Sequence, residues 1–249
     1  MERQKIRVAN WNLDHASNSS RPIEQQIETI KQIGPDILIL TETCEQVDLT
    51  PYGYTVTYAV KNDYGKYPAA VWSKFPFVRH HETSDETAVC AQLATPLGGM
   101  LVYGTIITYH GDKGPDNNSG AWIEHYKAIE KQGCDWDRLR AETALPLIVA
   151  GDFNQTRDGS TRTYGTSQGR KLLTEQLSKS GLICLTTEDF GANKKLKIDP
   201  KKGWHRNNID HICVTQHLFE IIKVGAWDHF TDDGVYLSDH NGVYVDLSA

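Results

Sequence analysis

The chain has 249 residues, of which 39% are hydrophobic and 23% are charged, and this composition is typical of a globular protein with one large core. Its formal net charge of −6 argues against a protein that coats nucleic acid non-specifically, because such proteins carry a basic surface. No apolar stretch approaches the roughly 20 residues that span a bilayer, so we expect one domain, residues 1–249, without membrane contact.

The predicted elements are mostly strands. In chain order, apolar patterns predict strands at residues 6–13, 36–40, 54–60, 69–72, 87–95 and 100–108, then at 209–215, 219–227 and 242–247. Helical spacing of apolar residues predicts helices at 22–33, 121–144 and 169–180. No internal repeat or low-complexity linker separates these elements. Many strands with few helices favour two packed sheets covered by helices.

The most informative segment is residues 147–154. An apolar run from Leu147 to Ala150 is typical of a buried strand, and it ends in a Gly-Asp-x-Asn turn. This turn places the Asp152 carboxylate beside the Asn154 carboxamide at the carboxyl end of a strand, where α/β proteins tend to bind ligands. Taken alone the motif is weak, because Gly, Asp and Asn are also ordinary turn formers.

Five other strand ends carry side chains of the same chemistry. An isolated acidic residue at such a position is usually a turn former, but several acids, amides and imidazoles that all adjoin apolar runs point to a shared site. The set consists of Asn12 and Asp14 after the first strand, Glu42 after the second, His110 after residues 102–109, Asp210 at the start of its strand, and Asp239 and His240 before the last strand.

These motifs resemble those of the endonuclease/exonuclease/phosphatase superfamily, which has the DNase I-like fold. They are W-N-L-D at 11–14, T-E at 41–42, Y-H at 109–110, G-D-F-N at 151–154, I-D-H at 209–211 and S-D-H at 238–240, and they follow the family's order across nearly the whole chain. The resemblance implies a four-layer α/β/β/α sandwich and a divalent-metal phosphoesterase.

The resemblance also implies a role for each residue. One group would lie at or beside the metal: Glu42 as the main ligand, Asn12 and Asp14 near the metal or the phosphate, and Asp239 as a further metal or hydrogen-bond partner. A second group would carry the chemistry: Asp152 and Asn154 would position the attacking water and hold the phosphoryl group, Asp210 would orient His240, and His110 would contact the phosphate.

Elementary chemistry supports these roles. Mg²⁺ or Mn²⁺ held by one or two carboxylates stabilises charge on phosphate oxygens and lowers the pKa of a bound water. Amide and imidazole donors aimed at the same oxygens act like an oxyanion hole. A carboxylate such as Asp210, bonded to the His240 imidazole, fixes the tautomer of the ring and makes it a cationic donor or an acid–base group. The sequence leaves open whether one or two metals take part.

Three further residues qualify this interpretation. Glu45 is a rival to Glu42 as metal ligand, but it lies beyond the strand end and therefore ranks second. Lys66 stands where many of the family's nucleases carry a glutamate, which weakens the analogy with pancreatic-type deoxyribonuclease. His211 directly follows Asp210 and therefore points to the opposite face of the strand, where packing is its expected role.

The sequence evidence about the substrate comes from residues 193–206, in which lysine and arginine are concentrated although the protein as a whole is acidic. Such a run is usually a solvated loop, but this one leads directly into the strand of Asp210, so steering of a phosphate is an equal alternative. Trp204 could stack on an exposed base or anchor the loop. The candidate substrate contacts are Lys201, Lys202, Trp204 and Arg206.

The cysteines and the amino terminus indicate the compartment. Residues 1–5 lead straight into a strand pattern without a signal-peptide core. The five cysteines are an odd number and no pair has C-x-x-C spacing, which favours buried reduced thiols over disulfides or a zinc site. We therefore expect a cytoplasmic protein, and no protein partner can be inferred.

Three functions remain open. The leading one is a metal-dependent phosphodiesterase that acts on nucleic acid, with DNA versus RNA and endo versus exo action undetermined. A phosphatase or phosphodiesterase of a small phosphorylated molecule would use nearly the same fold and site, because folds of this kind do not fix substrates. A non-catalytic binding protein is disfavoured, since the positions expected to carry chemistry hold competent residues, Lys66 apart.

Overall fold

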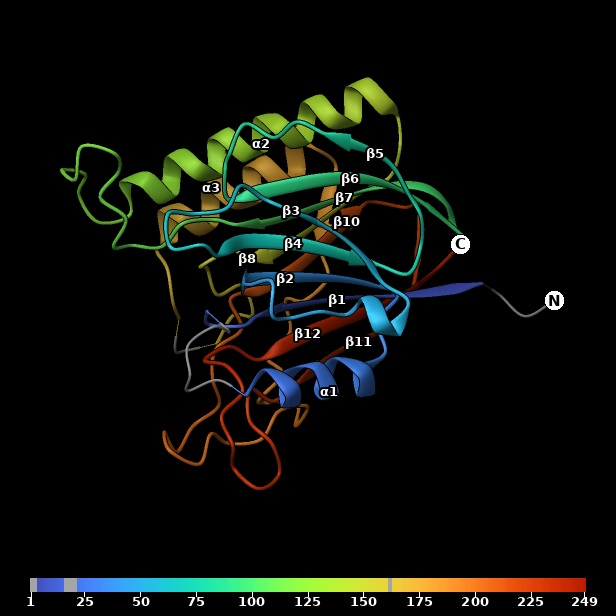
Figure 1. The fold of residues 1–249 in the computed structure, drawn as a ribbon. Helices are drawn as coiled ribbons and strands as arrows, with labels where there is room; N and C mark the ends of the chain where they lie inside the picture. The colour runs from blue at the N-terminus through green and yellow to red at the C-terminus, as the bar shows by residue number, and fades with distance from the viewer. Residues whose placement is uncertain (1–3, 16–21, 161–162) are drawn as a thin grey trace.

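The computed structural model describes residues 4–15, 22–160 and 163–249, which form four layers (Figure 1). Two six-stranded sheets pack face to face in the middle. Helix α1 (Ile23–Ile33) covers the outer face of the first sheet, and α2 (Ile123–Thr143) and α3 (Ser167–Lys179) cover the outer face of the second. This is the α/β/β/α sandwich that the sequence predicts. Across the described residues, no helix combines the length and apolarity needed to cross a membrane.

Both sheets are mixed. The first contains β1 (Lys5–Asn12), β2 (Ile37–Thr43), β3 (Thr55–Tyr58), β4 (Tyr67–Ser73), β11 (Glu220–Trp227) and β12 (Gly242–Ser248), in the order β11-β12-β1-β2-β4-β3. The second contains β5 (Phe77–His81), β6 (Ala88–Thr95), β7 (Gly98–Ile106), β8 (Leu147–Asp152), β9 (Leu182–Cys184) and β10 (Asp210–Thr215), in the order β5-β6-β7-β8-β10-β9. The central pairs β1–β2 and β7–β8 are parallel, so their carboxyl ends lie at one edge of the sandwich.

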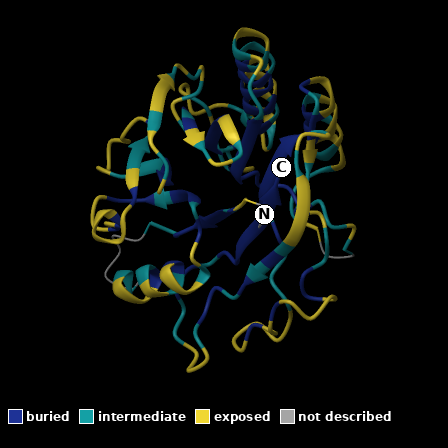
Figure 2. Ribbon diagram, turned by 90° about the vertical axis from the view of Figure 1, so that its right-hand side faces the viewer, coloured by how far each residue is buried: buried dark blue, intermediate teal, exposed yellow. Residues whose placement is uncertain are grey.

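The side chains of the central strands pack into two hydrophobic cores, one on each face of the sheet. In β2, Ile37 and Ile39 pack between the two sheets, whereas Leu38 and Leu40 pack against α1. Because successive side chains point to opposite faces, a strand covered on both sides must be apolar at every position. This is why β2 and β8 read as unbroken aliphatic runs, and Figure 2 shows such strands as the buried interior of the molecule.

The structure contains every helix and strand expected from the sequence, with ends shifted by a few residues. It adds a short 3₁₀ helix, η1 (Thr50–Tyr52), and the strands β5 and β9, for which no strand was predicted. These two strands are the edges of the second sheet. β5 is mostly exposed and includes His80 and His81, while β9 has only three residues, so neither carries a long apolar run.

Candidate active site

The candidate site lies where the inter-sheet core reaches the carboxyl ends of β1 and β8. In β1, Val8 packs between the sheets, and the period of two therefore turns Asn10 and Asn12 toward the same space. In β8, Ala150 belongs to the same core, so Asp152 follows it on that face. Each apolar strand face thus ends in a polar side chain that points toward the opposite sheet.

Asp210 joins this group from the start of β10. Its Cα is paired directly with that of Asp152 across the antiparallel β8–β10 ladder, while the next inward residue, Ile212, belongs to the core. Directly opposed residues on one face of a sheet lie in side-chain contact. Two buried carboxylates therefore stand side by side, both under 4% exposed.

Glu42 reaches the group through an unusual backbone conformation. It is still within β2, but its φ of +50° turns its side chain out of the regular alternation. The Asn12 Nδ2 then donates to Glu42 Oε1 (3.1 Å) and to Asp152 Oδ2 (3.2 Å). One buried amide therefore connects a carboxylate of the first sheet with a carboxylate of the second.

The carboxylates of Glu42 and Asp152 differ in pKa and therefore in protonation at neutral pH. Burial opposes ionisation of Glu42, but hydrogen bonds from His15 (Nε2 to Oε2, 2.9 Å) and Asn12 outweigh it, so the pKa of Glu42 is lowered. Burial raises the pKa of Asp152 to about 7, with His240 opposing and the Asp210 charge adding to that rise. Glu42 is accordingly an anion at neutral pH, and Asp152 is poised between its two protonation states.

His240 is held by an ion pair with Asp210. The distance from His240 Nδ1 to Asp210 Oδ2 is 2.6 Å, and Asn10 Nδ2 donates to the other carboxylate oxygen (3.1 Å). Burial disfavours the charged imidazole, but the charges of Asp210 and Asp152 outweigh it and raise the pKa of His240 to about 10. The ring is therefore an imidazolium at neutral pH, with Nδ1–H directed at Asp210.

The W-N-L-D and S-D-H motifs place this imidazole through their other residues. Trp11 Nε1 donates to the backbone oxygen of His240 (2.8 Å). The Ser238 hydroxyl donates to the backbone oxygen of Asn12 (2.6 Å) and accepts from the His240 N–H (3.0 Å). The segment before β12 is thus fixed to the end of β1.

The G-D-F-N turn has a tightly determined backbone. A Cβ at Gly151 would lie 1.7 Å from the backbone oxygen of Thr105, so only glycine allows β7 and β8 to approach this closely beside Asp152. Asn154 has a φ of +49° and donates from Nδ2 to the backbone oxygen of Ile107 (3.0 Å), while its N–H donates to Asp152 Oδ1 (2.9 Å). The turn therefore locks the orientation of the Asp152 carboxylate.

Backbone strain gathers at this site. The described residues include nine non-glycine positions with positive φ, and four of them are Asp14, His15, Glu42 and Asn154. Each such position costs energy that the surrounding structure must supply, and strain of this kind concentrates at functional sites. The concentration supports a functional role for this edge of the sandwich.

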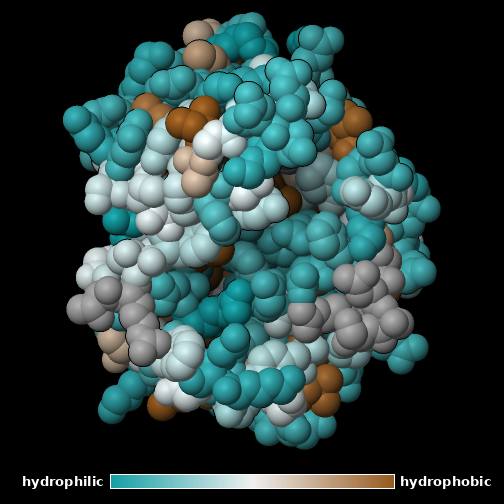
Figure 3. Space-filling view, turned by 90° about the vertical axis from the view of Figure 1, so that its left-hand side faces the viewer, coloured by the Kyte–Doolittle hydropathy of each residue, from teal (hydrophilic) through white to brown (hydrophobic). Residues whose placement is uncertain are grey.

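The site opens into a cavity of about 620 Å³ lined by Asn154, Tyr164, Arg206 and His240 among others. Figure 3 views the face on which β1 and β2 end, and shows it hollowed in the middle with mostly hydrophilic residues around the hollow. A cavity of this volume is in the range of ligand-binding sites. Its polar lining suits a polar or charged ligand.

Three of the expected site residues contact the site at its periphery. Asp14 reaches it through its backbone N–H, which donates to Asn12 Oδ1 (2.8 Å). Asp239 is half exposed at the cavity and pairs with Arg206 (3.1 Å), and its Oδ1 lies 3.6 Å from His240 Nε2. His110 is exposed and contacts the Tyr164 hydroxyl through Nδ1 (3.1 Å), so it meets the cavity wall by way of Tyr164.

The expected substrate contacts divide in two. Trp204 and Arg206 line the cavity beside His240, as a substrate role requires. Lys201 and Lys202 do not line it; the Lys201 ammonium lies over the Tyr236 ring, 3.7 Å from its centroid. Among the other lysines of the loop, Lys195 pairs with Glu188 and Lys197 with Asp232. The local charge run is therefore partly neutralised by one acid 7 positions away in the sequence and another 35 positions away. The rival ligand Glu45 is exposed and bonded to Lys61 Nζ (2.8 Å).

Four residues at the site were not singled out from the sequence: Asn10, His15, Tyr164 and Asn207. A signal existed for Asn10, because it is a polar residue two positions before Asn12 in an otherwise apolar strand. His15, Tyr164 and Asn207 lie in irregular segments, where no periodicity indicates the direction of a side chain.

A buried carboxylate anchors the basic loop. Asp199 accepts from Tyr236, from the backbone N–H groups of Lys201 (2.8 Å) and Lys202 (3.0 Å), and from His229 Nε2 (3.0 Å). Burial alone would raise the pKa of Asp199, but these donors outweigh it and lower the pKa to about 2. Since the carboxylate ionises more easily in the folded state, it stabilises the fold at neutral pH.

We expect Asp199→Asn to lower the free energy of unfolding by about 2 kcal/mol at pH 7. Because the pKa of Asp199 is lower in the folded state, its contribution is complete above about pH 4 and disappears as the pH falls through 2. Denaturant unfolding of both proteins at several pH values measures this, and the exposed Asp63→Asn is the control. A gap between Asp199→Asn and wild type that stayed constant down to pH 2 would contradict the assignment.

The donor set fits a hard divalent cation. Glu42, Asp152 and Asp210 are carboxylates, and Asn12 adds an amide, which are the oxygen ligands that Mg²⁺ and Mn²⁺ prefer. Among the described residues, Asp152, Asp210 and His240 also have potential ligand atoms within 4.8 Å of one another. His240 is cationic in that group and suits a donor role better than ligation. Burial and, after it, the charges of Asp210 and Glu42 raise the pKa of Asp152, and a bound cation would offset this cost of ionising Asp152.

Comparison with known proteins places these observations in context. The model of the Endonuclease/Exonuclease/phosphatase family matches residues 9–240. No curated protein sequence matches the chain.

Solved structures share the fold at low sequence identity. An endonuclease/exonuclease/phosphatase family protein from Bacteroides thetaiotaomicron has 17% identity and a TM-score of 0.66, over 99% of this chain and 98% of that one. The human Nocturnin catalytic domain with bound sulfate anion has 20% identity and a TM-score of 0.65, over 99% and 95%. The 3′ phosphatase NExo from Neisseria, bound to product DNA hairpin, has 14% identity and a TM-score of 0.68, over 98% and 100%.

Proposed function

This chain belongs to the endonuclease/exonuclease/phosphatase family, and we propose that it is a divalent-metal-dependent phosphodiesterase that acts on nucleic acid as a single domain. Members of the family hydrolyse phosphoester bonds, so the proposal concerns the cofactor, the residue roles and the substrate of this chain. The observation that carries it is the joining of the Asp210–His240 ion pair, Asp152 and the Asn12–Glu42 pair at one end of the inter-sheet core. The cytoplasmic compartment expected from the cysteines is part of the same proposal.

Glu42 and Asn12 would hold the metal. Glu42 supplies the anionic charge, because its pKa is lowered and its side chain is partly exposed. Asp14 supports them by fixing the Asn12 amide. When bound, Mg²⁺ or Mn²⁺ offsets charge on the phosphate oxygens and makes a bound water more acidic.

The remaining residues would handle protons and the phosphoryl group. Asp152, with a pKa near neutrality, can accept the proton of the attacking water on its carboxylate, which the Asn154 N–H orients through Oδ1 and the Asn12 Nδ2 through Oδ2. His240, cationic through Asp210, can donate from Nε2 to a phosphoryl oxygen or to the leaving oxygen. Arg206 would contact the phosphate from the cavity wall. His110 would act on the phosphate through Tyr164, which lies in the same wall.

Hydrolysis of bis(p-nitrophenyl) phosphate tests the proposal directly. We expect turnover with Mg²⁺ or Mn²⁺ and none after EDTA treatment, with activity restored when the metal is added back. DNA, RNA and small phosphoesters then rank the substrates. If no divalent ion supports hydrolysis of any of them, the chain is a binding protein on this fold and the proposal fails.

A second candidate is hydrolysis of a small phosphorylated molecule. The pairing of Lys195 with Glu188 and of Lys197 with Asp232 favours it, because these ammonium groups already have acidic partners within the protein. A small ester needs only the contacts around the scissile phosphate, whereas a polymer also needs cations along its backbone.

Charge reversal separates the two candidates. If the substrate is nucleic acid, we expect Lys201→Glu with Lys202→Glu to lower polymer cleavage roughly tenfold at physiological salt and to make its salt dependence shallower. Hydrolysis of the aryl diester should stay at the wild-type rate. The matched control reverses Lys31 and Lys171, which lie on the outer helices α1 and α3. Unchanged polymer cleavage would favour the small-molecule candidate.

A further inference from the structure

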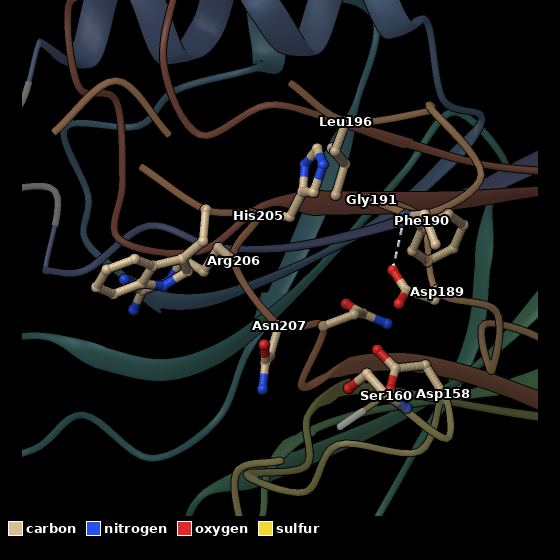
Figure 4. A pocket seen from close by; sticks show the side chains of 12 residues that line it. Asp158, Ser160, Asp189, Phe190, Gly191, Leu196, His205, Arg206 and Asn207 are labelled. Carbon is tan, nitrogen blue, oxygen red and sulfur yellow. Dashed lines mark hydrogen bonds between the residues drawn. The ribbon is translucent and has the colours of Figure 1, made fainter. Parts of the chain in front are cut away.

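A second cavity, of about 230 Å³, adjoins the catalytic one. The two share Trp204, Arg206 and Asn207 in their walls. Figure 4 shows the second cavity between the loop that carries Asp189 and Phe190 and the segment that carries Asp158 and Ser160. A substrate whose phosphate lies beside His240 could therefore extend past Arg206 into this cavity.

The charge of the second cavity does not suit a phosphate. Asp158 and Asp189 are both in its wall, and Figure 4 shows their carboxylates on the same side. Each accepts one backbone N–H, from Ser160 and Ala192 respectively (both 2.9 Å), which fixes its position. Arg206 is the one arginine among the described lining residues, and it pairs with Asp239. Two fixed carboxylates repel an anion and attract hydrogen-bond donors.

A buried amide points to the same kind of ligand. Asn208 is 4% exposed and lines this cavity. Its Nδ2 donates to the backbone oxygen of Thr186 (3.2 Å), but its Oδ1 has no hydrogen-bond partner among the described residues. A buried acceptor without a donor is costly and is rarely left so in folded proteins. Oδ1 is itself closed to solvent in this conformation, so a rotation of the Asn208 amide would bring it to a ligand N–H or O–H in the cavity.

The walls of the cavity also contain aromatic surface. Phe190 is buried at 2% exposure, whereas Trp204 is 46% exposed at the boundary with the catalytic cavity. An exposed indole in this place offers a face on which a flat ring can stack. Among the described residues, the cavity therefore combines a stacking surface with several acceptors and an excess of negative charge.

We propose that the second cavity binds the nucleoside part of the substrate, an uncharged group whose sugar hydroxyls or base amino group donate to Asp158, Asp189 and Asn208. This inference rests on the proposed phosphodiesterase function and narrows its substrate: the group next to the scissile phosphate on this side is a nucleoside without a further phosphate in the cavity. A terminal nucleotide meets this condition, and the interior of a polynucleotide does not.

The test compares two esters with the same leaving group. The p-nitrophenyl ester of adenosine 5′-monophosphate carries the nucleoside, and bis(p-nitrophenyl) phosphate does not. In the variant Asp158→Asn/Asp189→Asn, both backbone N–H groups keep an acceptor oxygen, but the charge is lost. We expect KM for the adenosine ester to rise roughly tenfold or more, with kcat and the aryl diester unchanged, because charge-assisted hydrogen bonds are lost.

A control variant and a second nucleoside ester distinguish the possible results of this test. Glu175→Gln, on α3, should change neither ester. The corresponding ester of purine riboside lacks the amino group but keeps both sugar hydroxyls, so retained dependence on the two aspartates assigns the donors to the sugar, and loss of it assigns them to the base. An unchanged KM for the adenosine ester would overturn the proposal, and a lowered KM would indicate that a phosphate occupies the cavity.

Binding measurements test the second cavity independently of whether the protein hydrolyses either ester. If the wild type hydrolysed neither ester, the proposed function would fail, but calorimetric titration with adenosine 5′-monophosphate would still test the cavity. We expect the double variant to bind this nucleotide roughly tenfold more weakly than the wild type. Equal affinity would overturn the inference even if both proteins are active phosphodiesterases.

Discussion

Glu42→Gln is expected to lower metal-dependent phosphoester hydrolysis roughly a hundredfold or more, while the fold is retained. Glutamine keeps an oxygen that can accept from Asn12 Nδ2, so the link to Asp152 survives. It lacks the negative charge that Mg²⁺ requires of its few protein ligands and that pairs with His15. Rates measured over a range of Mg²⁺ concentrations should show that the variant needs far more metal for half-maximal activity.

The neighbouring Glu45→Gln is the matched control. Glu45 is exposed and pairs with Lys61, so its loss should not change the metal dependence. Near-normal turnover of Glu42→Gln at limiting Mg²⁺ would show that the metal is held elsewhere. The group formed by Asp152, Asp210 and His240 would then be the first alternative, since its ligand atoms are close together.

The fold could be predicted from sequence because its central strands are covered on both faces. Residues 37–40 and 147–150 must fill two cores at once, which makes them aliphatic at every position and easy to recognise. β5 and β9 were missed for the opposite reason: an edge strand has one neighbour and more solvent contact, so its sequence is less constrained. The order of strands within each sheet was not predicted, because it depends on long-range pairing.

The candidate site was predictable where it follows strand ends. Asn12, Asp152 and Asp210 continue or begin the inward face of a strand, so the period of two brings them together. Glu42 lies on the other face by this period, and only its positive φ returns it to the site. Its assignment came from the resemblance of its motif to the family, not from periodicity.

The substrate loop shows where sequence reasoning stops. The lysines of residues 194–202 are adjacent in the chain, but their partners Glu188, Asp232 and Tyr236 are up to 35 positions away. A local charge run gives no information about such partners. In the same way, Asp158 and Asp189 belong to separate loops, and only the folded chain brings them into one cavity.

His240→Ala is expected to lower kcat by about 10²- to 10⁴-fold and to change KM little. The imidazolium is held by Asp210 at 2.6 Å and is proposed to act on charge that develops in the transition state, so its loss should not weaken substrate binding in the ground state. Asp210→Asn should cost less, because an asparagine oxygen can still accept from His240 Nδ1–H and keep the ring in place. If His240→Ala changed KM alone, His240 would contribute to substrate binding and not to the chemical step.

A comparison of substrates with different leaving groups then shows which oxygen of the phosphoester His240 acts on. A p-nitrophenolate leaves without a proton, whereas a sugar alkoxide needs one as the bond breaks. If His240 protonates the leaving oxygen, His240→Ala should reduce cleavage of a dinucleotide far more than cleavage of the p-nitrophenyl ester of the same nucleotide. If it stabilises a phosphoryl oxygen instead, both substrates should lose the same factor, because both develop similar charge there. Since Asp152 lies on the same inward face and acts on the attacking water in either case, Asp152→Asn should reduce both rates equally.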